Sequence, residues 1–216
     1  MIFHKNQKLV MIGDSITDAG RTRPAAAEGL FDPLGRGYVT MVEALIGACH
    51  PELGLRVVNT GNGGDNVRTI KGRWQADVLD LKPDWVSVMI GINDVWRQYD
   101  MPRQPETHVY LDEYTATLDE LVSRTLESVK GMILMAPYYI ESNRKDPMRA
   151  TMDRYGAAMK KVAAKHDALF IDTQAAFDQV LKTYYPGTLA WDRVHPNQAG
   201  HMVMARAFCK AVGLKW

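Results

Sequence analysis

LVMIGDSITD, residues 9–18, is the stretch of sequence that decides the fold. Four apolar residues lead into a glycine and then into small polar residues, a pattern typical of a buried parallel strand that ends in a tight turn. Ligands bind at the carboxyl ends of the strands in open α/β sheets. Ser15 therefore stands where a nucleophile would be useful. The alternative is that Ser15 or Thr17 simply caps the next helix, because both residue types are common N-caps.

Short apolar runs and longer amphipathic segments alternate through the rest of the chain. Further strands are expected at residues 55–59, 85–90, 132–136 and 168–172, and helices at 38–50, about 67–79, 111–129, 147–166, 174–183 and 196–212. Segments 95–108 and 184–194 are expected to be irregular, and the long connection 21–37 to border the active site. Strands that alternate with helices indicate a parallel sheet covered on both faces. We therefore predict a flavodoxin-like three-layer α/β/α sandwich with a central five-stranded parallel sheet, in a single domain of residues 1–216.

Composition and charge exclude several classes of protein. The chain of 216 residues is 46% hydrophobic, with 26 basic and 25 acidic residues. No basic stripe favours nucleic acid, and no run approaches the ~20 apolar residues that cross a bilayer. The N-terminal residues lack the apolar core of a secretory signal. Cys49 and Cys209 fall within helical patterns and indicate buried thiols in a reducing compartment, so we expect a cytoplasmic protein.

Groups suited to acyl transfer follow three of the predicted strands and precede the last helix. They are Ser15, the turn Gly61–Gly64, Asn93 and the loop Asp192–His195. Acyl transfer needs a hydroxyl, a base, an acid that orients the base, and donors for the oxyanion. We assign Ser15 as nucleophile, His195 as base and Asp192 as orienting acid. The oxyanion donors would be the Ser15 N–H, a glycine N–H of the second turn and the Asn93 amide.

Each of these residues also has a plain structural explanation. His195 could begin the last helix, Asp192 could form a turn, the glycines could form only a turn, and Asn93 could cap a helix. Asp14, next to the nucleophile, is interpreted as a turn or cap group and as a candidate substrate-binding residue. The histidines and cysteines show no compact metal-ligand spacing, so no metal or other cofactor is expected. The glycine turn lacks the Lys-Ser/Thr of a P-loop.

These four blocks, in this order, resemble those of the SGNH hydrolases, the GDSL-type esterases. The resemblance implies a Ser15–His195–Asp192 triad and an oxyanion hole of Ser15, Asn93 and one glycine. Gly64 is the better match for that glycine, with Gly61 and Gly63 left open. Segments 83–87, 91–99 and 189–196 further resemble bacterial intracellular acetylxylan esterases, which remove acetyl groups from xylo-oligosaccharides.

The resemblance implies a serine esterase that hydrolyses acetyl esters of xylo-oligosaccharides through an acetyl-enzyme, with a small acetylated oligosaccharide as its partner. Aromatic side chains suit stacking on sugar rings, so Trp96, Trp191 and Tyr185 are candidate substrate-binding residues, unless they only pack the loops. Trp191 is the preferred wall for a small acyl pocket. Alternatives are a lysophospholipase or thioesterase, a non-catalytic flavodoxin-like module that binds phosphate or nucleotide, and a carbohydrate-binding protein. Aromatics in segment 95–108 are compatible with a homo-oligomer.

Overall fold

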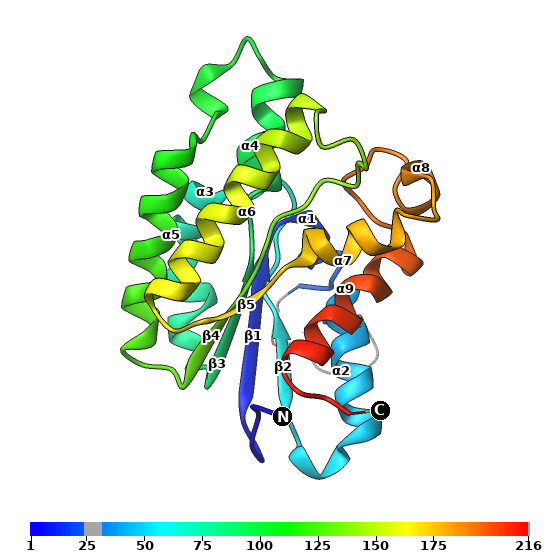
Figure 1. Ribbon diagram of the computed structural model, residues 1–216. Coiled ribbons are helices and arrows are strands. Elements are labelled where there is room, and N and C mark those ends of the chain that lie inside the picture. The colour runs from blue at the N-terminus through cyan, green and yellow to red at the C-terminus, as the bar shows by residue number, and fades with distance from the viewer. Residues whose placement is uncertain (24–31, 216) are drawn as a thin grey trace.

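Five parallel strands form the centre of the protein in a computed structural model that describes residues 1–23 and 32–215 (Figure 1). Their order in the sheet is β2-β1-β3-β4-β5. The strands are β1 (Lys8–Gly13), β2 (Arg56–Asn59), β3 (Trp85–Met89), β4 (Gly131–Met135) and β5 (Leu169–Ile171). In the register of the sheet, Met11 of β1 lies opposite Asn59 of β2 and Ser87 of β3. The apolar run of residues 9–12 is completely buried, because β1 is flanked by a strand on each side and covered on both faces.

Helices cover both faces of the sheet, which confirms the predicted three-layer α/β/α class. Figure 1 shows α3, α5 and α6 on one side and α2, α7 and α9 on the other. Their bounds are α2 (Tyr38–Cys49), α3 (Val67–Asp77), α5 (Leu111–Leu126), α6 (Pro147–Lys165), α7 (Thr173–Val180) and α9 (Gln198–Ala211). The short helices are α1 (Ser15–Asp18), α4 (Ile92–Asp100) and α8 (Pro186–Leu189), with single 3-10 turns at Pro51–Leu53, Leu79–Leu81 and Pro105–Thr107. No helix of the described ranges is long and apolar enough to cross a membrane.

Two segments that we predicted to be irregular contain helix. The segment from residue 95 belongs to α4, which starts before it at Ile92. Ile92 and Val95 lie one turn apart and are both buried, and Gln98 donates to the carbonyl of Asp94, so packing and a side-chain bond stabilise the helix. Within the predicted loop 184–194, Pro186 opens the single turn of α8, a position in which proline is favoured.

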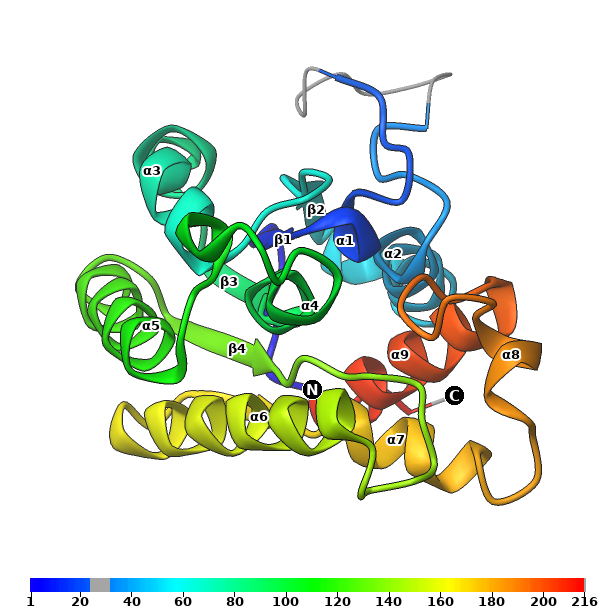
Figure 2. The same ribbon diagram turned by 90° about the horizontal axis from the view of Figure 1, so that it is seen from above.

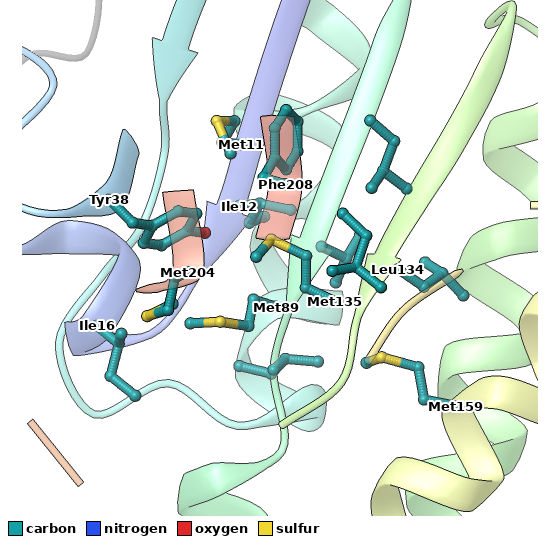
Figure 3. Close-up of a cluster of buried hydrophobic side chains, with 14 of the residues drawn as sticks. Met11, Ile12, Ile16, Tyr38, Met89, Leu134, Met135, Met159, Met204 and Phe208 are labelled. Atoms are coloured by element: carbon teal, nitrogen blue, oxygen red, sulfur yellow. The ribbon is translucent and has the colours of Figure 1, made fainter. Parts of the chain in front are cut away.

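The core next to the sheet is rich in methionine. Figure 3 shows Met11, Met89, Met135, Met159 and Met204 packed among aliphatic side chains and the ring of Phe208. All five methionines are buried. Unbranched thioethers fill irregular spaces that branched side chains leave open.

Candidate active site

The carboxyl ends of β1, β2 and β3 meet at the point where the strand order changes direction. The chain leaves β1 toward β2 on one side and returns to β3 on the other, so this edge is the topological switch point of the sheet. Figure 2 looks onto this edge, where α1 and α4 lie. The loop between α8 and α9, here called the catalytic loop (residues 190–195), reaches the same place from the C-terminal part of the chain.

The turn after β1 presents Ser15 at the first position of α1. Asp14, and not Ser15 or Thr17, is the N-cap, because its Oδ1 accepts a hydrogen bond of 2.9 Å from the Ile16 N–H. Gly13 is required before this turn. A Cβ there would lie 2.3 Å from Thr17 Oγ1 and 2.4 Å from the Met89 carbonyl oxygen. Only glycine fits at this close approach of the turn to β3, and because Asp14 caps the helix, the Ser15 hydroxyl has no capping role.

Ser15, His195 and Asp192 form a continuous hydrogen-bonded chain. The distance from Ser15 Oγ to His195 Nε2 is 2.8 Å, and the distance from His195 Nδ1 to Asp192 Oδ2 is 2.6 Å. Asp192 Oδ1 accepts from the backbone N–H groups of Val194 (2.9 Å) and His195 (2.8 Å). Burial opposes ionisation of Asp192, but the hydrogen bonds from His195 and these two N–H groups hold the pKa of the carboxyl below its ordinary value. An ionised Asp192 can hold the imidazole with its proton on Nδ1.

The glycine turn after β2 leaves one N–H group free. The Gly61 N–H donates to Asn59 Oδ1 at 2.8 Å, and the Gly63 N–H donates to Asp18 Oδ2 at 3.2 Å. The Gly64 N–H has no acceptor among the described residues. Gly64 has φ +83°, and a Cβ at this position would meet no atom within 4 Å, so its backbone is open to a ligand. This bonding pattern favours Gly64 over the other two glycines as an oxyanion donor.

Asn93 supplies a side-chain donor at the same edge. One of its amide hydrogens is directed to the Asp65 carbonyl oxygen (2.8 Å), and its Oδ1 accepts from the Arg97 guanidinium at 3.3 Å. These two bonds fix which way the amide faces, and the second N–H remains available. With the Ser15 N–H, which has no acceptor in the described part of the chain, the site offers three unused donors from three different strand ends.

Two supporting residues were not identified from the sequence. Asn59, buried at the end of β2, donates to the carbonyl oxygens of Thr17 (2.6 Å) and Leu34 (2.8 Å) and so ties α1 to the glycine turn. Arg73 of α3 binds Asp65 Oδ2 at 2.6 Å and the Gly13 carbonyl oxygen at 3.2 Å. A polar residue that ends an apolar strand was a usable signal for Asn59. Arg73 carried no such signal, because charged residues are ordinary on a helix.

Asp14 and Asp94 are buried carboxyl groups beneath the site. Burial raises the pKa of each to about 7. Asp94 Oδ1 accepts from the Val67 N–H at 3.0 Å and joins α4 to α3, whereas its Oδ2 has no partner among the described residues. Asp14, predicted as a candidate substrate-binding residue, has a buried side chain that caps α1.

Two of the three candidate aromatic residues lie next to His195. The Trp96 ring meets the His195 ring edge-on at 5.9 Å, and the Arg97 guanidinium lies 4.6 Å from the centre of the same indole. Trp191, 86% exposed, borders a depression beside His195 that Gly187, Leu189, Ala190, Pro196 and Asn197 also line. Tyr185 is 73% exposed and lies over Gly187 at the rim. The connection 21–37, expected to border the site, includes residues 24–31, which lie outside the described residues.

Comparison with known proteins gives strong matches over the whole chain. Residues 11–203 match the model of the GDSL-like lipase/acylhydrolase family. An acetylxylan esterase of Geobacillus stearothermophilus is 61% identical over 97% of this chain and 95% of its own. The crystal structure of Axe2, an acetylxylan esterase of the same organism, superposes with a TM-score of 0.98 at 60% identity and covers 100% of this chain and 98% of that one.

Other solved structures agree with these matches. Three catalytic mutants of Axe2 are known, in which a serine, a histidine and an aspartate are each replaced by alanine. LAE5, an α/β hydrolase from the metagenome of Lake Arreo, is 56% identical, with a TM-score of 0.97 over 99% of this chain and 98% of its own.

Proposed function

The chain belongs to the GDSL-like lipase/acylhydrolase family, and on that premise we propose that it removes acetyl groups from xylo-oligosaccharides. It is a serine ester hydrolase, and its high identity to an acetylxylan esterase supports the choice of substrate. One observation carries the proposed chemistry. A hydroxyl, an imidazole and a carboxylate are joined at 2.8 and 2.6 Å, beside backbone and amide donors that have no acceptor of their own among the described residues.

The first half of the proposed reaction forms an acetyl-enzyme. His195 Nε2 accepts the proton of Ser15 as Oγ attacks the acetyl carbonyl carbon. Asp192 holds the opposite ring proton on Nδ1 and stabilises the imidazolium that forms. The negative charge of the tetrahedral intermediate is taken up by the N–H groups of Ser15, Gly64 and Asn93. His195 then gives its proton to the sugar oxygen, which leaves as a hydroxyl.

The second half repeats these steps with water in place of the serine. His195 takes a proton from water, the resulting hydroxide attacks the acetyl carbon, and the same donors hold the new oxyanion. Ser15 leaves with the proton from His195, and acetate is released. All of the proton transfers run through one imidazole, so its alignment with Ser15 determines both halves of the reaction.

The surroundings of His195 favour a small acyl group over a long one. The depression at His195 is lined by Trp191 and Pro196, and the Trp96 ring lies edge-on to the imidazole at 5.9 Å. A lysophospholipase or thioesterase would need an extended apolar groove at this point. We therefore propose that the acetyl group, whose carbonyl must lie at Ser15 and the oxyanion donors, has Trp191 as a wall, and that the depression and the exposed ring of Tyr185 are available to a sugar unit further out.

The test compares acetate release from acetylated xylobiose by the wild type and by Ser15→Ala. We expect release by the wild type and a loss of about a million-fold in the variant, as for other serine nucleophiles, with an unchanged circular dichroism spectrum. Equal release by both proteins would refute the role of Ser15. No release by either would refute the substrate, and p-nitrophenyl acetate and decanoate would then show whether the enzyme takes short or long acyl chains.

Location and assembly are part of the same proposal. We propose a cytoplasmic enzyme, which the free thiols of Cys49 and Cys209 support, because such thiols persist in a reducing compartment. We also propose that it forms a homo-oligomer, since Tyr99 in the last turn of α4 and Tyr110 at the start of α5 are exposed. Sedimentation velocity at several protein concentrations tests the assembly, and a monomer at every concentration would refute it.

A further inference from the structure

The catalytic loop contains a backbone conformation that its own residues do not favour. Arg193 lies between Asp192 and His195 and has φ +64°, in the left-handed region. This turn lets one oxygen of the Asp192 carboxylate accept from the N–H groups of Val194 and His195. A left-handed conformation is disfavoured for a residue with a side chain. Besides these bonds within the loop, contacts from outside it hold Arg193 in this conformation.

Those contacts come from the segment that follows β4, residues 138–141. The Ile140 N–H donates to the Arg193 carbonyl oxygen at 2.9 Å, and the Tyr138 hydroxyl donates to the Val194 carbonyl oxygen at 3.3 Å. The Arg193 guanidinium donates to Glu141 Oε2 at 2.6 Å. The segment 138–141 thus holds Arg193 through both its backbone carbonyl and its side chain.

Glu141 is itself held firmly. Its side chain is buried, and its second oxygen accepts from the Asn143 N–H at 2.7 Å. Its carbonyl oxygen accepts from the guanidinium of Arg149, which is buried on α6. Arg149 in turn forms two parallel hydrogen bonds of 2.9 and 2.8 Å with Asp178 of α7. The Arg193 guanidinium is partly exposed. Glu141, in contrast, is linked through Arg149 to both α6 and α7.

We propose that Glu141, acting through Arg193, is a positioning residue that keeps the catalytic loop aligned. The inference rests on the proposed function and goes beyond it, because Glu141 touches none of the reacting atoms. Without the Glu141 carboxylate the guanidinium loses its ion pair and keeps the contact with Tyr139, while the turn keeps the hydrogen bonds that the Ile140 N–H and the Tyr138 hydroxyl donate to it. Misplacement of a catalytic group by about 1 Å can cost a hundred-fold in rate. We expect kcat to fall ten- to hundred-fold while KM stays within two-fold, because substrate binding uses other residues.

The experiment measures two quantities for Glu141→Gln and Arg193→Met, which both remove the ion pair. One is kcat for acetate release. The other is the rate of inactivation by an organophosphate that attacks the active serine, which depends on His195 but not on any sugar. Arg193→Lys is the conservative variant and should retain most of the rate. Asp119→Asn breaks an ion pair of similar length (2.7 Å to Lys165) on α5 and should leave both rates unchanged.

The double variant Glu141→Gln/Arg193→Met separates positioning from general loss of stability. Since Arg193→Met already removes the contact with Glu141, the double variant should be no slower than Arg193→Met alone. The inference is overturned if Glu141→Gln, still folded by circular dichroism, keeps both rates within two-fold of the wild type, or if the two losses multiply. Should Glu141→Gln fail to fold, the comparison of Arg193→Met with Arg193→Lys decides, and equal rates in those two variants refute the inference. If the organophosphate inactivates the wild type but the wild type releases no acetate, the proposed substrate is refuted. The inactivation rates of the variants then still test the positioning role of Glu141.

Discussion

Replacing Asp192 by asparagine would reverse the direction of one hydrogen bond and leave the rest of the loop in place. Asp192 Oδ1 accepts from the N–H groups of Val194 and His195, so the amide oxygen of the asparagine must take that position. Its NH₂ group must then face His195 Nδ1, which becomes an acceptor. The ring proton moves to Nε2, 2.8 Å from Ser15 Oγ, where it blocks the transfer of the serine proton. The same change of tautomer in a chymotrypsin-type triad lowers kcat about 10⁴-fold.

We therefore expect kcat of Asp192→Asn to fall about 10⁴-fold, a barrier increase of about 5 kcal/mol, with little change in KM. Initial rates of acetate release at pH 7 give both constants, and nitrogen NMR of the imidazole reports which ring nitrogen carries the proton. The matched control is Asp172→Asn at the N-cap of α7, where asparagine can accept the Ala175 N–H equally well and activity should be unchanged. A kcat of Asp192→Asn within ten-fold of the wild type would refute the reasoning.

Three further predictions address the oxyanion donors, the buried acids and the charge network. Asn93→Ala should lower kcat 10²- to 10³-fold with an unchanged fold, and a loss below five-fold in steady-state assays would remove Asn93 from the oxyanion hole. The pKa of Asp94 is raised to about 7 by burial, so the folded protein holds this proton more tightly than the unfolded chain does. Its contribution to the free energy of unfolding therefore falls by about 1.4 kcal/mol per pH unit between roughly pH 4 and 7. Urea titrations should show a flatter pH dependence in Asp94→Asn, and parallel curves for the two proteins would contradict this. Arg149→Met removes the two-pronged partner of Asp178, which keeps Arg144 and Gln174, and leaves the Glu141 carbonyl oxygen without its donor, so chemical denaturation should show a loss of about 1–3 kcal/mol, and an unchanged midpoint would contradict the role given to Arg149.

The sequence indicated the sheet and the main parts of the site because both leave local signals. A four-residue apolar run that ends in Gly13 marks β1 and places Ser15 after it, and the three-residue spacing of Asp192 and His195 suits a shared loop. The structure brings these three side chains together. Parallel topology accounts for this, because it collects the carboxyl ends of separate strands at one edge.

Other features depend on partners that no local pattern contains. Gly64 could be preferred to Gly61 and Gly63 as the oxyanion donor only once the acceptors of the other two N–H groups, Asn59 and Asp18, were known. Glu141 and Arg193 are 52 residues apart in the chain, and neither stands out in its own segment. Helix α4 was predicted as a loop because its aromatic and charged residues obscured the two buried apolar positions that define its inner face.

Oxidation of the buried methionines would report how often the core of this protein opens. Peroxide converts accessible methionine to the sulfoxide, and Met11, Met135, Met159 and Met204 are completely shielded in the native state. Oxidation at these four sites requires the core to open, whereas the exposed Met202 reacts without opening. Mass spectrometry after brief peroxide exposure would therefore give a site-by-site measure of how often each side of the sheet becomes accessible, with an internal reference for reagent strength.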